Sequence, residues 1–208
     1  MPTPIYHITH IKNLTSILNS DGLIAVSTLK QKQVSYTNIA YEQIQGRRAR
    51  KIVPCGIGGV LHDYVPFYFA PRSPMLYTIH KGNVPGYQDG QSSIIHLVVE
   101  IEAIANSNLA FVFTDGHAVM DYSDFYDDLY ELNYIDWELM ESKYWFDIDE
   151  DNNRKCRRQA EFLVHKFCPW TLVKEIGVVN NNMKIKVQKI LENQDYQPIV
   201  KIHSDWYY

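Results

Sequence analysis

The segment Ser93–Ile101 (SIIHLVVEI) constrains the fold most, because it is the clearest buried strand in the sequence. Similar but shorter apolar or alternating segments predict further strands at Ile5–Thr9, Tyr64–Ala70, Leu109–Thr114, Ala160–Lys166, Glu175–Val179 and Ile199–His203. Helices are predicted at Ile11–Asn19, Ile39–Lys51, Ser73–Gly82 and Met183–Asn193, with two more inside Ser123–Glu141. These elements follow no regular strand–helix–strand rhythm. The order therefore favours an α+β fold with a largely antiparallel sheet over a Rossmann-type fold.

The sequence predicts loops in the remaining segments. Thr28–Ser35 is polar, Pro54–Gly59 is rich in turn residues, and Asp147–Asn153 is acidic. The chain has 208 residues, of which 46% are hydrophobic and 21% charged, as expected for an ordinary globular protein. This length suits one domain spanning residues 1–208.

The net charge of −4 argues mildly against a protein that coats nucleic acid nonspecifically, although it permits a local basic groove. The sequence begins without a secretion signal and holds no apolar run of membrane-spanning length. Its three cysteines are far apart and outside any CxxC pattern, which favours reduced thiols in the cytoplasm. The eight histidines form neither HExxH nor a His/Cys cluster, so we predict no metal site. We also expect a monomer.

Four segments carry candidate chemistry. The first is YHITH, in which alternation places His7 and Thr9 on one face of a strand and Tyr6, Ile8 and His10 on the other. A histidine beside a threonine could bind a ribose hydroxyl or a carboxamide. From this segment alone, a hydrogen-bonded core histidine is the better interpretation.

The second segment is the basic run GRRARK. On a helix, Arg47, Arg48, Arg50 and Lys51 cover more than one face, so they cannot all bind one ligand. Most of them suit a solvated face, and one or two could bind phosphate.

The third segment runs from Gly56 to Leu76 and combines glycines and aromatic residues with His62, Asp63 and Arg72. It lacks the spacing of a Walker or dinucleotide motif. The chain also lacks a nucleophile elbow, which argues against a Ser/Cys hydrolase.

The fourth segment is QAEFLV, in which Glu161 interrupts an apolar strand. Carboxylates are rarely buried without a reason. A glutamate at a strand edge could stabilise a cationic transition state. A salt bridge to Arg157 or Arg158 is the equally weighted alternative.

Taken together and in order, several segments resemble the DarT family of DNA ADP-ribosyltransferases. They are PTPIYHITHIKNL, RRAR, GGVLHDYVPFYFAPRSPMLY, FVFTDGHAV, QAEFLVHKFCPW and the terminal DWYY. The resemblance covers nearly the whole chain. It implies an ADP-ribosyltransferase fold, a split and mostly antiparallel β-sandwich with flanking helices. It also implies an enzyme that uses NAD, without a metal, to modify a base of single-stranded DNA. The family's usual partner is the macrodomain antitoxin DarG.

The resemblance also assigns residues. It implies that Glu161 and Arg48 are catalytic, and that Arg48 also helps to bind NAD. The remaining assignments are NAD contacts at His7, Thr9 and Asn13, and DNA contacts at Tyr68, Met75, His117, Arg72 and His62.

Three alternatives remain open at the level of sequence. The acceptor could be RNA or protein. The aromatic residues, including 15 tyrosines, and the basic clusters also suit a noncatalytic nucleic-acid-binding module, but that function leaves Glu161 unused. A nuclease would need an acidic metal cluster, and Asp147–Asp151 is instead typical of a solvated loop. Within the family, the sequence is closer to the branch that modifies thymine at N3 than to the guanine branch.

Overall fold

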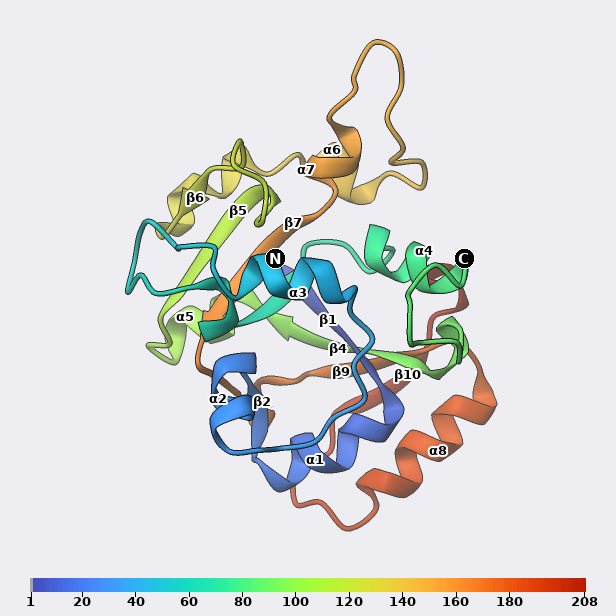
Figure 1. Ribbon diagram of the computed structural model, residues 1–208. Coiled ribbons are helices and arrows are strands. Elements are labelled where there is room, and N and C mark those ends of the chain that lie inside the picture. The colour runs from blue at the N-terminus through green and yellow to red at the C-terminus, as the bar shows by residue number, and fades with distance from the viewer. Residues whose placement is uncertain (1) are drawn as a thin grey trace.

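A computed structural model describes residues 2–208 and shows a large mixed sheet flanked by helices (Figure 1). The strand order in this eight-stranded sheet is β10-β9-β4-β1-β3-β7-β5-β6. Within residues 2–208 only β9 and β10 pair in parallel, so the predicted α+β class with a largely antiparallel sheet is confirmed. The strands of the large sheet are β1 (Pro4–His10), β3 (Tyr64–Tyr68), β4 (Ile94–Glu100), β5 (Phe111–His117), β6 (Phe125–Tyr126), β7 (Ala160–His165), β9 (Glu175–Val178) and β10 (Ile199–Ile202). A second, two-stranded sheet joins β2 (Gly22–Ile24) to β8 (Phe167–Pro169).

Strand β4 lies inside the molecule, as its sequence predicts. Residues from Ile94 to Val99 are all buried, on both faces of the strand. A run of β-branched and leucine residues is stable in this position because neither face meets water. Strand β7 is similar, being buried from Ala160 to Val164.

The large sheet is nearly split between β1 and β3. Strand β1 pairs with β4 along its whole length, from Pro4–Glu100 to His10–Ile94. With β3 it shares the single register pair Tyr6–Tyr68. The predicted split therefore appears as two halves of one sheet, with β10, β9, β4 and β1 on one side and β3, β7, β5 and β6 on the other.

Short helices surround the sheet. The α-helices are α1 (Leu14–Asn19), α2 (Val26–Gln31), α3 (Glu42–Arg48), α4 (Pro74–His80), α5 (Ile101–Asn106), α6 (Trp137–Glu141), α7 (Arg154–Arg157) and α8 (Asn181–Leu191). Helix α4 begins as the sequence predicts, because the Ser73 side chain accepts a hydrogen bond from the Leu76 amide and Pro74 occupies the first turn. Helix α8 packs against β9 and β10 (Figure 1). Across residues 2–208, every helix is too short or too polar to span a membrane.

Two local predictions need correction, and one helix was missed. Thr28–Ser35 is not wholly loop, because α2 covers its first part and is held by the Leu29 amide donating to the Ala25 carbonyl. Ser123–Glu141 contains two helices, as predicted, but one is a 3-10 helix and a strand precedes both. Its first part pairs with β5 as β6, where the Tyr126 ring stacks on Phe113, and a 3-10 helix (η4, Leu129–Tyr134) follows. Helix α5 directly follows β4 and was not predicted.

Candidate active site

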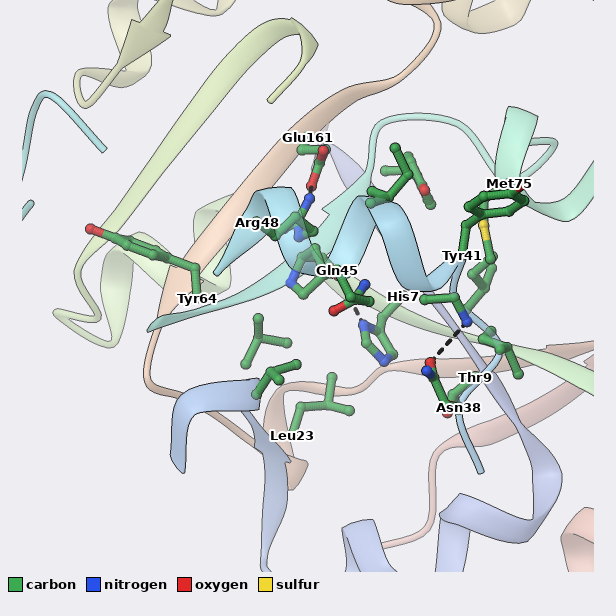
Figure 2. Close-up of a pocket in the computed structure, with 18 of the residues that line it drawn as sticks. His7, Thr9, Leu23, Asn38, Tyr41, Gln45, Arg48, Tyr64, Met75 and Glu161 are labelled. Atoms are coloured by element: carbon green, nitrogen blue, oxygen red, sulfur yellow. Dashed lines mark hydrogen bonds and ion pairs between the residues drawn. The ribbon is translucent and has the colours of Figure 1, made fainter. Parts of the chain in front are cut away.

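A pocket of about 590 Å³ lies beside β1, between the small β2–β8 sheet and helices α3 and α4. Residues from many segments line it, including the loop before α3 and the ends of β3, β5 and β7. Figure 2 shows Arg48 of α3 and Glu161 of β7 facing one another, with His7 and Thr9 of β1 farther along the same pocket. The pocket thus gathers side chains that are far apart in the sequence.

A buried ion pair lies at the centre of the site. The Arg48 guanidinium donates from Nη1 to Oε2 of Glu161 at 2.7 Å, and the Glu161 side chain is 3% exposed. The other carboxylate oxygen, Oε1, lies 3.3 Å from His117 Nδ1 and 3.3 Å from the amide of Ala118. The Glu161 amide donates to Thr114 Oγ1 at 3.2 Å, which also fixes its backbone. The carboxylate is therefore held in one orientation.

The charge of Glu161 is set by two opposing effects. Burial raises the pKa of a carboxyl group because it disfavours the ionised form. Here the neighbouring Arg48 and the contact with His117 more than offset burial and lower the pKa of Glu161 to about 2. Glu161 is therefore ionised at neutral pH. The second guanidinium nitrogen of Arg48, Nη2, is buried without a hydrogen-bond partner in the described chain, which leaves a donor for an anionic ligand.

Two β1 residues form another wall of the pocket. His7 donates from Nδ1 to the Pro66 carbonyl at 2.8 Å, because a carbonyl can only accept. Burial lowers the pKa of His7, so the ring is neutral and Nε2 is an acceptor. Asn13 donates to Thr9 Oγ1 at 3.0 Å and to the carbonyl of Thr37 at 2.9 Å, and accepts from the Thr37 amide at 2.7 Å. Asn13 thereby fastens the loop before α3 to β1.

Tyr68, Met75 and His117 line the same pocket, and Tyr68 and His117 lie close to Glu161. The Tyr68 side chain is half-buried, and burial together with the negative charge of Glu161 raises its pKa, so the phenol stays protonated. Met75 extends from α4 into the pocket (Figure 2).

The structure does not bring His62 and Arg72 to this pocket. His62 is 5% exposed and lies beneath α3, where its Nε2 is 3.1 Å from Gln45 Oε1. Burial, with the positive charges of Lys30 and Arg48, lowers the pKa of His62 to about 4. Arg72 lines a different cavity, with its guanidinium 4.3 Å from the centre of the Tyr208 ring.

A salt bridge from Glu161 to Arg157 or Arg158 is ruled out by the contacts of these arginines. Arg157 pairs with Asp136 and Asp151. Arg158 donates to backbone carbonyls, including those of Met140 and Ser142.

The basic residues of GRRARK point in different directions, as their spacing on a helix predicts. Arg48 is buried, while Arg47 donates to the Val119 carbonyl and Lys51 pairs with Asp121. Among residues 2–208, no group of three or more His, Cys, Asp and Glu side chains is placed to hold a metal ion.

Sequence reasoning missed several residues of the pocket wall. Asn38, Tyr41 and Gln45 line it, and Leu23 closes its lower side in Figure 2. Gln45 could have been found from its position one helical turn before Arg48, which places both side chains on one face. Leu23 had no such signal, because its position depends on the pairing of β2 with β8.

The sequence and the fold resemble those of known proteins. The family model described as "ssDNA thymidine ADP-ribosyltransferase, DarT" matches residues 6–208. A DNA ADP-ribosyl transferase from Thermus sp. (strain 2.9) is 49% identical, over 100% of this chain and 97% of the relative. The solved structure "Thermus sp. 2.9 DarT in complex with ADP-ribosylated ssDNA" superposes with a TM-score of 0.93 at 47% identity, covering 100% of this chain and 97% of the other. The solved structure "Thermus sp. 2.9 DarT in complex with NAD+" superposes with a TM-score of 0.89 at 45% identity, covering 100% of this chain and 98% of the other.

A more distant relative from Thermosipho africanus is a DNA ADP-ribosyl transferase fused to a DNA ADP-ribosyl glycohydrolase. It is 22% identical over 92% of this chain, which spans 46% of that protein. The family match and the fold define a DNA ADP-ribosyltransferase. Within that class, the chain belongs to the DarT family.

Proposed function

We propose that the enzyme transfers ADP-ribose from NAD to N3 of a thymine in single-stranded DNA, within a short sequence motif. The buried Arg48–Glu161 pair in the wall of a 590 Å³ pocket is the observation that carries this proposal. The description of the matching family as a thymidine-modifying one supports thymine as the acceptor. The NAD+ complex of the Thermus relative supports NAD as the donor.

Glu161 would act on the ribose. As the bond between nicotinamide and the ribose C1′ breaks, its electron pair neutralises the pyridinium and positive charge develops on the ribose. The ionised Glu161 stabilises that charge or holds the ribose hydroxyls. Thymine N3 then bonds to C1′, so the N3 proton must leave. The products are neutral nicotinamide, modified thymine and one proton.

Arg48 would act on the acceptor or on the NAD phosphates. A guanidinium has a pKa above about 12 and is a poor general base. Its unpartnered Nη2 can instead donate to a thymine oxygen and so lower the pKa of N3, or donate to a phosphate oxygen. Direct proton abstraction by Arg48 is the alternative form of the same proposal, and it requires the guanidinium first to release one of its own protons.

The remaining side chains divide between the two substrates. His7 and Thr9 would hold NAD, with Asn13 fastening the loop that covers it. Tyr68, Met75 and His117 would position the unstacked base, which is easiest to present from a single strand.

We further propose that the chain is one catalytic domain and acts as the toxin of a toxin–antitoxin pair in the cytoplasm. The family match spans residues 6–208, which supports one domain. The fused glycohydrolase of the Thermosipho relative supports a DarG-type macrodomain partner that removes the modification. The free thiols of Cys55, Cys156 and Cys168 agree with a reducing compartment.

Mass spectrometry of oligonucleotides incubated with NAD tests the acceptor. We expect one ADP-ribose on a thymine-containing single strand and none on the same strand with every thymine methylated at N3. Parallel reactions contain RNA and a protein lysate. Modification of guanine, or preferential labelling of RNA or protein, would contradict the proposal.

A further inference from the structure

A second cavity lies on the other side of β1 from the catalytic pocket. We call it the rear cavity, and its volume is about 690 Å³. Tyr6 lines the rear cavity, whereas the next β1 residue, His7, lines the catalytic pocket. The segment Pro71–Arg72 faces the rear cavity, and Pro74–Met75 faces the catalytic pocket. The two spaces are therefore neighbours with separate walls.

Two arginines of the rear cavity lack a counter-ion. Arg158 is 3% exposed, and its terminal nitrogens donate to backbone carbonyls, among them Ser142 at 2.9 Å and Arg72 at 3.2 Å. Arg72 contacts the face of Tyr208. In the described chain neither arginine pairs with a carboxylate, and in both the Nε atom is buried without a hydrogen-bond partner. A buried guanidinium in this condition is costly unless an anion reaches it.

The acidic side chains at the rear cavity do not supply that anion. Glu141 and Asp205 line the cavity but are exposed, and within residues 2–208 neither forms an ion pair. Lys143 adds a further exposed cation to the wall. Burial, and the positive charge of Arg72, lower the pKa of Arg158 to about 10, although the ionised form of Tyr208 would oppose this, so the guanidinium remains charged at neutral pH.

Aromatic side chains form much of the remaining wall. Tyr6, Trp137 and Trp206 come from three separate segments and are each half-buried, and the more deeply buried Phe69 and Tyr207 lie with them. Arginines supply directional donors to phosphate, and aromatic rings supply faces or edges for a base. We propose that the rear cavity binds a nucleoside monophosphate unit, with its phosphate at Arg72 and Arg158 and its base among the aromatic rings.

Calorimetric titration tests the proposal on the whole protein saturated with NAD. Saturation occupies the catalytic pocket and is itself measured first, so failure of NAD binding is distinguished from failure of the rear cavity. The probes are dAMP, deoxyadenosine and inorganic phosphate. Thymine nucleotides are avoided because they could enter the proposed acceptor position. We expect dAMP to bind at least about tenfold more tightly than either fragment, since each lacks one half of the contacts.

Variants assign the binding to the rear cavity. Arg72→Gln should weaken dAMP about tenfold, and Lys143→Glu should weaken it several-fold. The matched control Lys186→Glu changes the same charge on the exposed face of α8 and should leave dAMP affinity unchanged. Thermal unfolding checks that each variant is folded. The proposal is overturned if dAMP does not bind, if phosphate alone binds as tightly, or if Arg72→Gln binds as the natural protein does.

Competition identifies the source of the nucleotide. A single-stranded oligonucleotide that displaces dAMP from the NAD-saturated protein assigns the rear cavity to a nucleotide of the DNA strand. Persistent dAMP binding beside a bound oligonucleotide assigns it to a free nucleotide. Both results support nucleotide binding in the rear cavity, provided that Arg72→Gln weakens the binding of dAMP.

Discussion

The catalytic pocket and the rear cavity each contain a nearly inaccessible arginine, and they neutralise it in opposite ways. Arg48 lies 2.7 Å from Glu161, so the protein supplies its counter-charge internally. Arg158 is surrounded by backbone carbonyls and no carboxylate. The charge of Arg48 is balanced before any ligand arrives, although its Nη2 keeps a donor without a partner in the described chain, whereas an arginine held only by dipoles still favours an anion. The comparison shows that burial of an arginine does not by itself reveal its role. The groups that contact the guanidinium decide whether it completes an internal ion pair or favours an external anion.

The largest expected effect comes from removing the charge of Glu161. Glu161→Gln keeps the shape of the side chain but should lower the rate of DNA modification about 10²–10³-fold, because the developing ribose cation loses its anion. Mass-spectrometric rates on a thymine oligonucleotide measure this, and calorimetry checks that NAD still binds.

The matched control is Glu192→Gln, the same change on an exposed residue at the end of α8, away from both cavities. We expect a rate within about twofold of the natural protein, since a surface charge of this kind contributes little. Equal losses in both variants would show that Glu161 has no special role.

The second test concerns stability. Arg48→Met or Glu161→Met alone should each cost about 3–5 kcal/mol of unfolding free energy, because each leaves a buried charge without its partner. The double variant should lose far less than the sum, since no unpaired charge remains. Urea unfolding of the four proteins measures the coupling. Additive losses would contradict an ion pair that is energetically isolated from solvent.

A smaller effect is expected at Asn13, which connects β1 to the loop before α3. Asn13→Ala should raise the KM for NAD about tenfold through loss of these hydrogen bonds, with a smaller change in kcat. Steady-state kinetics at saturating DNA separate the two constants. Asn182→Ala, on the exposed surface of α8, is the control. A fall in kcat with unchanged KM would argue against a role in holding NAD.

The last test concerns the pH dependence of stability, to which each buried histidine makes its own small contribution per pH unit. His96 supports the rear cavity by donating to the Pro71 carbonyl at 3.0 Å, and burial lowers its pKa to about 4. The unfolded histidine has a pKa of about 6.5, so the unfolded state binds the proton first and stability falls as the pH drops from about 6.5 to 4. Each such histidine contributes a slope of about 1.4 kcal/mol per pH unit within that window.

The carboxylate of the catalytic pocket responds in a different range. The pKa of Glu161 is lowered to about 2, so its contribution is complete above about pH 4.5 and is lost between there and pH 2. Urea unfolding from pH 4.5 to 7.5 should therefore show the summed slopes of His96, His62 and His7, and His96→Gln should reduce the total by about 1.4 kcal/mol per pH unit. An unchanged slope in that variant would contradict the assignment.

Much of the fold follows from local sequence, because β4 and β7 are buried on both faces and the start of α4 carries its own capping residues. What local sequence could not give was the partner of Glu161. Arg157 and Arg158 are adjacent to it in the chain, yet the partner is Arg48, 113 positions away. Sequence proximity favours the wrong arginines because the chain turns at the start of β7 and directs them toward α6 and its neighbours.

The resemblance to the DarT family supplied part of this missing information, since it placed Glu161 and Arg48 in one site. It could not separate His62 and Arg72 from the pocket, because both occur in the same motif as Tyr68 and Met75. A 3-10 turn directs His62 under α3, and the bend after β3 directs Arg72 to the rear. Only tertiary structure distinguishes these directions.

The single Tyr6–Tyr68 register pair has a consequence for how activity arises during folding. His7 and Thr9 belong to one half of the sheet and Glu161 to the other, while Arg48 comes from a helix outside both. A partly folded chain with either half intact would lack one wall of the pocket. We therefore expect transferase activity only from the completely folded chain, in which both halves of the sheet and α3 are in place.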